Sequence, residues 1–284
     1  MAGTLFVVAT PIGNLEDISA RALRVLREVA LIAAEDTRHT GHLLQRFGLT
    51  TRTISFHEHS EKGKAAALVE RLRAGESIAL VTDAGTPAVS DPGHHLVKLA
   101  HEAGIRVEPI PGASAVVAAL SASGFGSNGF CFLGFPPTKG SSREEWFARF
   151  AAAPAVAPTL VFYEAPHRIE ATLHELHRRF GDLEIALGRE LTKAHEEIRL
   201  GRLGTIEVPE VRGEFTVVVD FGELTSLSGR SSPVDGPGIA LEFGHMTEKE
   251  GLTRRQAISS LARRHRLQAR EIFSMLEDHK KSGV

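Results

Sequence analysis

The sequence predicts an α/β protein built from two α/β domains and a small helical C-terminal unit. Strand-length apolar runs alternate with helical spacing over residues 1–120, which indicates a first α/β domain. Over residues 121–222 the strands follow one another at shorter intervals, which indicates a second domain with a mixed sheet. Residues 223–246 are rich in Gly, Ser and Pro and are predicted to be a linker, so that residues 247–284 form a separate unit.

Composition and charge exclude several classes of protein. A chain of 284 residues that is 42% hydrophobic can bury a sizeable core, and its net charge of −2 argues against a wholly basic nucleic-acid binder. Cys131 is the single cysteine, which excludes a disulfide framework or a thiolate metal cluster. No apolar run approaches the roughly 20 residues that span a bilayer, and the first residues lack the charged region of a signal peptide. We therefore expect a cytoplasmic protein with no membrane partner.

The first domain begins with the strand TLFVVAT and a helix in which Ile18, Ala22, Val25, Leu26 and Val29 recur at helical spacing. Further strands are predicted at LIAAED, RTISFHE, SIALVT and RVEPI, and further helices at KAAALVERLRAG, HHLVKLAHEAG and SAVVAALSASG. A series of βαβ units of this kind predicts a mostly parallel sheet that is covered by helices on both faces.

The second domain is predicted to hold the strands FCFLGF, TLVFYEA, LEIALGREL, EEIRLGRLGTI and GEFTVVVDF. Its helices are a segment rich in Arg and Glu between the first two strands, and RIEATLHELHRRFG after the second. The last unit is predicted to contain two helices, whose apolar positions are Ala257, Ile258 and Leu261 in one and Ile272, Phe273 and Leu276 in the other.

Three strand ends of the first domain are unusually rich in turn residues: residues 10–14, 83–87 and 109–114. Ligands of open α/β sheets gather beyond the carboxyl ends of the strands, so three such loops together favour a pocket, although each alone could be a turn. The G-x-x-x-x-G-K-[ST] and G-x-G-x-x-G patterns are both missing, which argues against NTP hydrolysis and a standard dinucleotide site. Asp83 lacks the second carboxylate of a phosphatase loop, which favours ligand recognition over phosphoryl transfer.

The segment EDTRHT follows the second predicted strand and allows two interpretations. Glu35, Asp36, Thr37 and Arg38 either line the mouth of a substrate site, or Asp36 or Thr37 simply caps the next helix.

The segment SFHEHSE brings together His57, Glu58, His59 and Glu61, which suggests a metal site. Alternate residues at the end of a strand share a face for structural reasons alone, and no third and fourth ligands are evident. We expect no metal.

Six motifs occur in order between Thr4 and Phe221: VATPIGNLEDIS, AAEDTRHT, LVTDAGTPAVSDPG, PIPGASA, FYEAPHRI and RELTKAHEE. With these motifs the chain resembles the ribosomal RNA small subunit methyltransferase I family, within the wider tetrapyrrole methylase fold. The resemblance implies two α/β domains with an S-adenosylmethionine cofactor in the cleft between them. It also implies 2′-O-methylation of a cytidine ribose in the decoding region of 16S small-subunit ribosomal RNA, by a homodimer.

The resemblance further implies a set of cofactor-binding residues: Pro11, Val81, Thr82, Asp83, Gly85, Thr86, Val89, Ser114, Ala115, Tyr163 and Leu191. The methyl group of S-adenosylmethionine is already activated, so the protein has chiefly to align it with the ribose oxygen and to assist loss of the proton. Candidate bases are Glu164, His167, Glu190 and Lys193, any of which could instead form a salt bridge or an RNA contact. A lysine would need its usual pKa of about 10.4 lowered by burial or by neighbouring cations.

Candidate substrate-binding residues are Glu35, Asp36, Arg38, Arg168, Arg189, Arg254, Arg255, Arg263 and Arg264. Residues 253–270 contain no acidic residue, so the last unit is expected to dock RNA, unless its arginines form only a solvated face. Two rival functions remain: methylation of a porphyrin-like ring on the same fold, and a non-catalytic RNA-binding or ribosome assembly protein.

Overall fold

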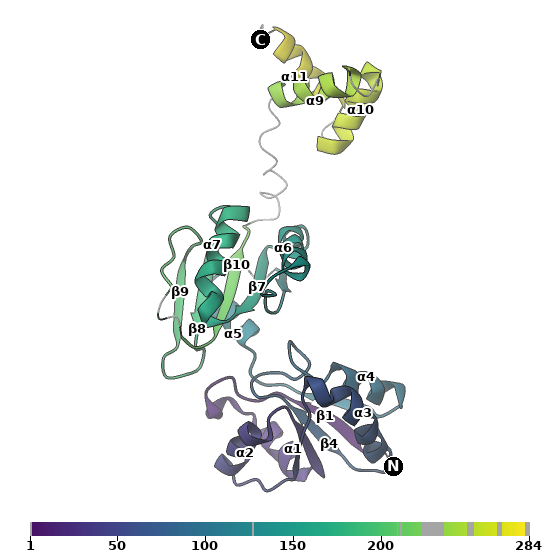
Figure 1. Ribbon diagram of the computed structural model, residues 1–284, viewed down its shortest axis with the longest axis vertical. Helices are drawn as coiled ribbons and strands as arrows, with labels where there is room; N and C mark the ends of the chain where they lie inside the picture. The colour runs from purple at the N-terminus through teal and green to yellow at the C-terminus, as the bar shows by residue number, and fades with distance from the viewer. Residues whose placement is uncertain are drawn as a thin grey trace. The chain divides into compact units, whose positions relative to one another are not determined.

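The computed structural model describes residues 2–126, 128–208, 210, 212–222, 236–248, 253–265 and 269–281. The chain forms two compact units, Met1–Phe221 and Gly222–Val284 (Figure 1). The first unit contains two sheets with helices against them, which confirms the predicted α/β class. Among the described residues, no helix is long and apolar enough to cross a membrane.

The first sheet has the strand order β3-β2-β4-β1-β5, and all of its paired strands are parallel. Its strands are β1 (Thr4–Val8), β2 (Leu31–Ala34), β3 (Thr53–Ser55), β4 (Ile78–Val81) and β5 (Arg106–Ile110). The connecting helices are α1 (Ala20–Glu28), α2 (Thr37–Arg46), α3 (Glu58–Arg73) and α4 (His94–Glu102), with a 3-10 turn at Leu15–Asp17. Parallel strands end at a common edge, so the loops after β1, β2, β4 and β5 all meet there.

Helices cover both faces of this sheet because its strands are apolar on both sides. Leu5, Leu31 and Leu80 pack with α3 and α4, whereas Ile32 and Val81 face α1 and α2. Burial on both faces explains why these strands are continuous apolar runs in the sequence.

The second sheet has the order β6-β7-β10-β8-β9 and is mixed, because β6 and β7 are parallel while the other pairs are antiparallel. Its strands are β6 (Phe130–Phe132), β7 (Thr159–Glu164), β8 (Glu184–Arg189), β9 (Glu197–Arg202) and β10 (Phe215–Asp220). The helices are α5 (Ala115–Ala122), α6 (Ser141–Ala152) and α7 (Ile169–Phe180), with 3-10 turns at Ala153–Ala155 and Pro166–Arg168.

Helix α5 packs with the second sheet, whereas the predicted boundary at residue 120 placed it in the first domain. Its buried residues Val116 and Leu120 pack against Val161 of β7, Ala186 of β8 and Val218 of β10, so α5 belongs with the second sheet. The sequence places α5 directly after the last parallel strand, which is why helical periodicity alone assigns it to the first domain. The contacts of α5 therefore place it with the second sheet, within the single compact unit Met1–Phe221.

The predicted secondary structure around His57 also differs from the observed one. Strand β3 ends at Ser55 and α3 begins at Glu58, so residues 58–61 belong to the first turn of a helix and not to a strand end. His57 precedes that turn, and its backbone N–H donates to Ser60 Oγ at 3.2 Å. The side chains of Glu58, His59 and Glu61 lie outside the described part of the structure. Over the described residues, no group of three or more His, Cys, Asp or Glu side chains could hold a metal ion.

The second unit contains α9 (Gly236–Glu248), α10 (Arg254–His265) and α11 (Ala269–Lys281), which pack around Ile239, Met246, Ala257, Leu261 and Ile272. Helix α9 occupies part of the segment predicted to be linker, and it is a helix in addition to the two predicted. Its Gly and Pro content suggests a linker, whereas the burial of Ile239 and Met246 holds it in the core.

Candidate active site

The loop after β4 is pinned to the loop after β1 by a short bridge. The Thr10 N–H donates to the Gly85 carbonyl at 2.9 Å, and the Gly85 N–H donates back to the Thr10 carbonyl at 3.1 Å. The Thr10 hydroxyl donates to the carbonyl of Thr82 at 3.0 Å. Gly85 has a φ of +86°, which explains why a glycine stands at this turn. The two loops therefore form one fixed edge at the carboxyl ends of the strands.

A chain of hydrogen bonds orders the carboxylates at this edge. The Asp83 N–H donates to Glu35 Oε2 at 3.2 Å, and the Thr82 hydroxyl donates to the same oxygen. Asp83 Oδ1 in turn accepts the N–H of Asp36 at 3.1 Å. Burial raises the pKa of Asp83, and the negative charges of Glu35 and Asp36 act in the same direction.

A cavity of about 410 Å³ lies at this edge, between the loops of the first sheet and the strands β7 and β10 of the second. We name it the acidic cavity, because five carboxylates line it: Glu35, Asp83, Asp91, Glu164 and Glu214. It brings together most of the predicted cofactor residues, namely Thr82, Asp83, Gly85, Thr86, Val89, Ser114, Ala115 and Tyr163.

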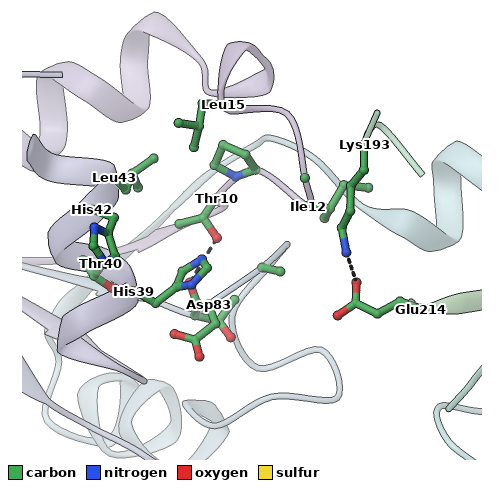
Figure 2. Close-up of a pocket in the computed structure, with 14 residues that line it drawn as sticks. Thr10, Ile12, Leu15, His39, Thr40, His42, Leu43, Asp83, Lys193 and Glu214 are labelled. Atoms are coloured by element: carbon green, nitrogen blue, oxygen red, sulfur yellow. Dashed lines mark hydrogen bonds and ion pairs between the residues drawn. The ribbon is translucent and has the colours of Figure 1, made fainter. Parts of the chain in front are cut away.

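A second cavity, of about 510 Å³, adjoins the first. We name it the histidine cavity, since His39 and His42 of α2 line it opposite Lys193 and Glu214 (Figure 2). Predicted cofactor residue Pro11 lines this cavity and not the acidic one. The two cavities share the wall formed by Ile12, Thr82, Asp83, Ala84 and Glu214.

The loop after β8 brings Lys193 to the histidine cavity. Glu190 and Thr192 adopt positive φ values of 49° and 67° in this loop. Lys193 Nζ lies 2.8 Å from Glu190 Oε1 and 3.0 Å from Glu214 Oε2. Thr192 Oγ1 accepts the N–H of Asn14 at 3.0 Å, which ties this loop to the loop after β1.

The neighbouring carboxylates of Glu190 and Glu214 favour the charged form of Lys193. Burial lowers the pKa of Lys193, but its hydrogen bonds to Glu190 and Glu214 outweigh burial and raise the pKa above its usual value. For Glu190, burial raises the pKa, but the hydrogen bonds from Lys193 and from the Glu214 N–H outweigh it and lower the pKa. Lys193 therefore lacks the lowered pKa that a lysine base needs.

Glu164 faces the acidic cavity, but it is buried and its oxygens already accept several hydrogen bonds. They accept the Ala165 N–H at 2.8 Å and the Thr172 hydroxyl at 2.7 Å, and Arg168 Nε lies 3.0 Å from Oε1. These contacts fix the start of α7 beneath the cavity. They make Glu164 a support of the wall rather than a free base.

Glu164→Gln is expected to lower the free energy of unfolding by about 1–2 kcal/mol, because a hydrogen bond to the charged Arg168 is replaced by a weaker one. Urea denaturation followed by circular dichroism measures this change. Glu170→Gln, at an exposed position of α7, is the matched control and should change stability by less than about 0.5 kcal/mol. Equal stability of the two variants would contradict the supporting role of Glu164.

Several other predicted site residues line neither cavity. Val81 and Leu191 are core residues with exposed fractions of 1% and 7%. His167 is exposed, and Glu190 reaches the site only through Lys193.

Two of the predicted substrate arginines are engaged inside the fold. Arg168 is bonded to Glu164, and Arg189 is 9% exposed and lies 3.8 Å from Glu197 and from Glu210. Both side chains are therefore already engaged with carboxylates. The sequence could not show this, because it does not reveal whether an arginine near the end of a strand turns inward.

Of the two interpretations of EDTRHT, the helix cap is confirmed, whereas a substrate mouth stays a prediction. Asp36 caps α2 by accepting the Arg38 N–H at 2.8 Å, and its side chain pairs with Arg38 at 2.7 Å. Glu35 instead lines the acidic cavity. The sequence reasoning missed Asp91, Phe135, Glu214 and the two histidines of α2. Glu214 could have been found, because it stands at the start of the predicted strand GEFTVVVDF.

The chain matches the family model described as Tetrapyrrole (Corrin/Porphyrin) Methylases over residues 4–207. It is 50% identical to the ribosomal RNA small subunit methyltransferase I of Pseudomonas aeruginosa, over 77% of this chain and 79% of that protein. The protein of the same name from Synechocystis is 42% identical over 96% of this chain and 97% of its own length.

Solved structures share the fold at low sequence identity. A diphthine synthase superposes with a TM-score of 0.63 at 18% identity, covering 77% of this chain and 90% of the other. Uroporphyrin-III C-methyl transferase from Thermus thermophilus, complexed with S-adenyl homocysteine, gives 0.52 at 19%, covering 79% of this chain and all (100%) of the other. The match to the family model and the identity to these relatives show that the chain belongs to the ribosomal RNA small subunit methyltransferase I family of tetrapyrrole methylases and is a methyltransferase.

Proposed function

We propose that the protein methylates the 2′-hydroxyl of a cytidine ribose in the decoding region of 16S small-subunit ribosomal RNA. It is an S-adenosylmethionine-dependent enzyme, and its substrate is ribosomal RNA. One observation carries the finer proposal: the acidic and histidine cavities share the wall at Asp83 and Glu214. Methyl transfer requires a donor site next to an acceptor site, and the shared lining residues support this arrangement because they make the two cavities neighbours.

The acidic cavity fits the cofactor. Its volume of about 410 Å³ lies in the range of small-molecule sites, which is about 300–1,000 Å³. Apolar and aromatic walls at Ile12, Phe135 and Tyr163 suit an adenosine group, and the Asp83 carboxylate suits amine or hydroxyl donors. When bound there, S-adenosylmethionine supplies a methyl group that its sulfonium has already activated.

The histidine cavity fits the ribose and its phosphates. His39, His42 and Lys193 line it with hydrogen-bond donors, and Thr10 and Thr40 add hydroxyls. Phosphate contacts of this kind position a nucleotide, whereas the choice of cytidine requires contacts to its base edge.

Lys193, Glu214 and Glu190 each have a different role in the proposed loss of the hydroxyl proton. The Lys193 ammonium can donate to the ribose oxygen as negative charge develops there, which is the type of stabilisation that an oxyanion site gives. Glu214 Oε2, at the wall that both cavities share, can accept the hydroxyl proton. Glu190 holds the lysine in place through the 2.8 Å contact.

The test is transfer of label from methyl-labelled S-adenosylmethionine to one of three acceptors: small-subunit particles, naked 16S RNA or a tetrapyrrole precursor. We expect label in RNA, and nuclease mapping should find it on a cytidine ribose. Label in the tetrapyrrole would support ring methylation instead. Label in none of them, with the cofactor bound, would support a non-catalytic RNA-binding or assembly protein.

We also propose that the enzyme acts in the cytoplasm as a homodimer, because two-fold association is the commonest assembly of soluble proteins. Light scattering at micromolar concentration should give twice the mass of the chain, and a mass equal to one chain would contradict the dimer.

The C-terminal unit is proposed to dock RNA through its arginines. Arg255 and Arg270 are exposed, whereas Arg254 pairs with Glu277 at 2.7 Å and lies over the ring of Phe273. Phe273 is 47% exposed, so it is not the core residue that helical spacing predicts. The side chains of Arg263 and Arg264 lie outside the described residues.

Ending the chain at Gly222 is expected to weaken RNA binding while leaving cofactor affinity unchanged. This end point removes the whole second unit, whereas an end near Gly244 would divide α9. Arg255→Gln with Arg270→Gln should flatten the salt dependence of RNA affinity by nearly one unit of slope for each phosphate that the protein no longer neutralises. Arg73→Gln, an exposed arginine of α3, is the control. Undiminished binding of small-subunit particles by the shortened chain would rule out docking by this unit.

A further inference from the structure

The acidic cavity has an unusual charge balance. Five carboxylates line it, and its described lining contains no lysine, arginine or histidine. Two of the five are neutralised from outside the cavity, because Glu164 pairs with Arg168 and Glu214 pairs with Lys193.

The other three carboxylates, Glu35, Asp83 and Asp91, have no ion pair with lysine or arginine in the described part of the chain. Hydrogen bonds hold two of them in place: Glu35 accepts from Thr82 and Asp83, and Asp83 accepts from Asp36. The charges of Arg38 and His39, which do not line this cavity, act on Asp83 from outside it. Partly buried carboxylates without an ion pair are costly, so a positive ligand in this cavity would relieve that cost.

Aromatic rings supply a second and independent feature that favours a cation. Tyr163 and Phe135 both line the cavity, with ring centroids 5.2 Å apart. The faces of aromatic rings attract positive groups, including quaternary ammonium ions. Rings and carboxylates on the same cavity thus select for the same sign of charge.

We propose that Glu35, Asp83 and Asp91 make the acidic cavity select the positively charged methyl donor over its neutral demethylated product. This inference rests on the proposed function, which places S-adenosylmethionine in this cavity. In the transfer, the carbon–sulfur bond breaks, the ribose oxygen forms the new bond to the methyl carbon, and the hydroxyl proton leaves. The sulfur keeps the electron pair and becomes a neutral thioether. The reaction therefore removes the charge that the carboxylates attract, which weakens retention of the product.

Asp91 makes this selection depend on pH. Burial raises its pKa to about 6, and the charges of Glu35 and Asp83 contribute in the same direction, while the nearby Thr82 hydroxyl opposes them. The other titratable groups that line the cavity are Tyr163, Glu164 and Glu214. As the pH falls through about 6, Asp91 takes up a proton and one negative charge disappears. Preference for the donor should then decrease, and donor binding near this pH should release a proton.

The test is isothermal titration calorimetry of S-adenosylmethionine and S-adenosylhomocysteine at pH 7.5 and constant ionic strength. Asp91→Asn and, separately, Glu35→Gln are expected to weaken donor binding by about 5- to 50-fold, as removal of one charge at a few ångströms predicts. The same variants should weaken product binding by less than about 2-fold, because the neutral sulfur gains little from the carboxylates. Asp182→Asn, which replaces a partly exposed aspartate that precedes β8, is the matched control and should change neither affinity.

To test the pH dependence, both calorimetric titrations are repeated at pH 5 with the unchanged protein and with Asp91→Asn. The ratio of product to donor dissociation constants should fall in the unchanged protein and stay nearly constant in the variant. Equal weakening of donor and product by both variants would overturn the inference while leaving the cofactor site intact. Failure of the unchanged protein to bind either ligand would instead overturn the cofactor assignment in the proposed function.

Discussion

Lys193→Ala is expected to lower turnover by about 10²–10³-fold while changing the affinity for S-adenosylmethionine little. The ammonium lines the histidine cavity and not the acidic cavity, so its removal affects the acceptor side of the site. The magnitude is that of removing one donor aimed at a developing negative charge. Single-turnover rates with small-subunit RNA and calorimetry with the cofactor separate the two effects.

Two variants refine this result. Lys193→Arg keeps the charge and should recover part of the activity, whereas Glu190→Gln should lower turnover less, since Glu190 acts only through the lysine. A turnover near normal in both Lys193→Ala and Glu190→Gln would contradict the role of this group. Glu214 would then have to accept the proton without help from the lysine, and Asp83, which also lines both cavities, would be the next candidate.

Asp83→Ala is expected to weaken cofactor binding by about 1.5–3 kcal/mol, the range for a hydrogen bond to a charged group. The carboxylate faces the acidic cavity and is fixed by the 3.1 Å bond from the Asp36 N–H, so little rearrangement is needed to meet a ligand donor. Calorimetry measures the change, and thermal unfolding confirms that the variant is folded.

Asp83→Asn is the companion variant, because it keeps an oxygen that can accept the Asp36 N–H but removes the charge. Its donor affinity should lie between those of the unchanged protein and Asp83→Ala. Unchanged affinity in Asp83→Ala would exclude Asp83 from the cofactor site.

The first sheet could be predicted from the sequence because its strands are buried on both faces and its helices are amphipathic. Ile32 and Leu80 lie in continuous apolar runs that only a covered parallel sheet produces. Helix α5 could not be assigned to its sheet in the same way. Its apolar residues suit either core, and only the contacts of Val116 and Leu120 decide between them.

The site could be predicted in part. Loops after parallel strands converge by geometry, and the resemblance implied Asp83, Thr86 and Ser114 within those loops; all three line the acidic cavity. Lys193 was also identified, but its charge state was not, because that depends on Glu214, which is distant in the sequence. Asp91 was missed because a carboxylate in a Pro-rich turn has the same appearance in sequence whether it faces solvent or a cavity.

The hydrogen bond between Asn14 and Thr192 has a consequence for ligand exchange. Asn14 follows the first strand of one sheet, and Thr192 follows β8 of the other, next to Lys193. Any opening that separates the two sheets must break this bond and carry the ammonium away from the histidines of α2. If ligands enter by such an opening, we expect the acceptor side to be incomplete while the site is open, because Lys193 moves with Thr192.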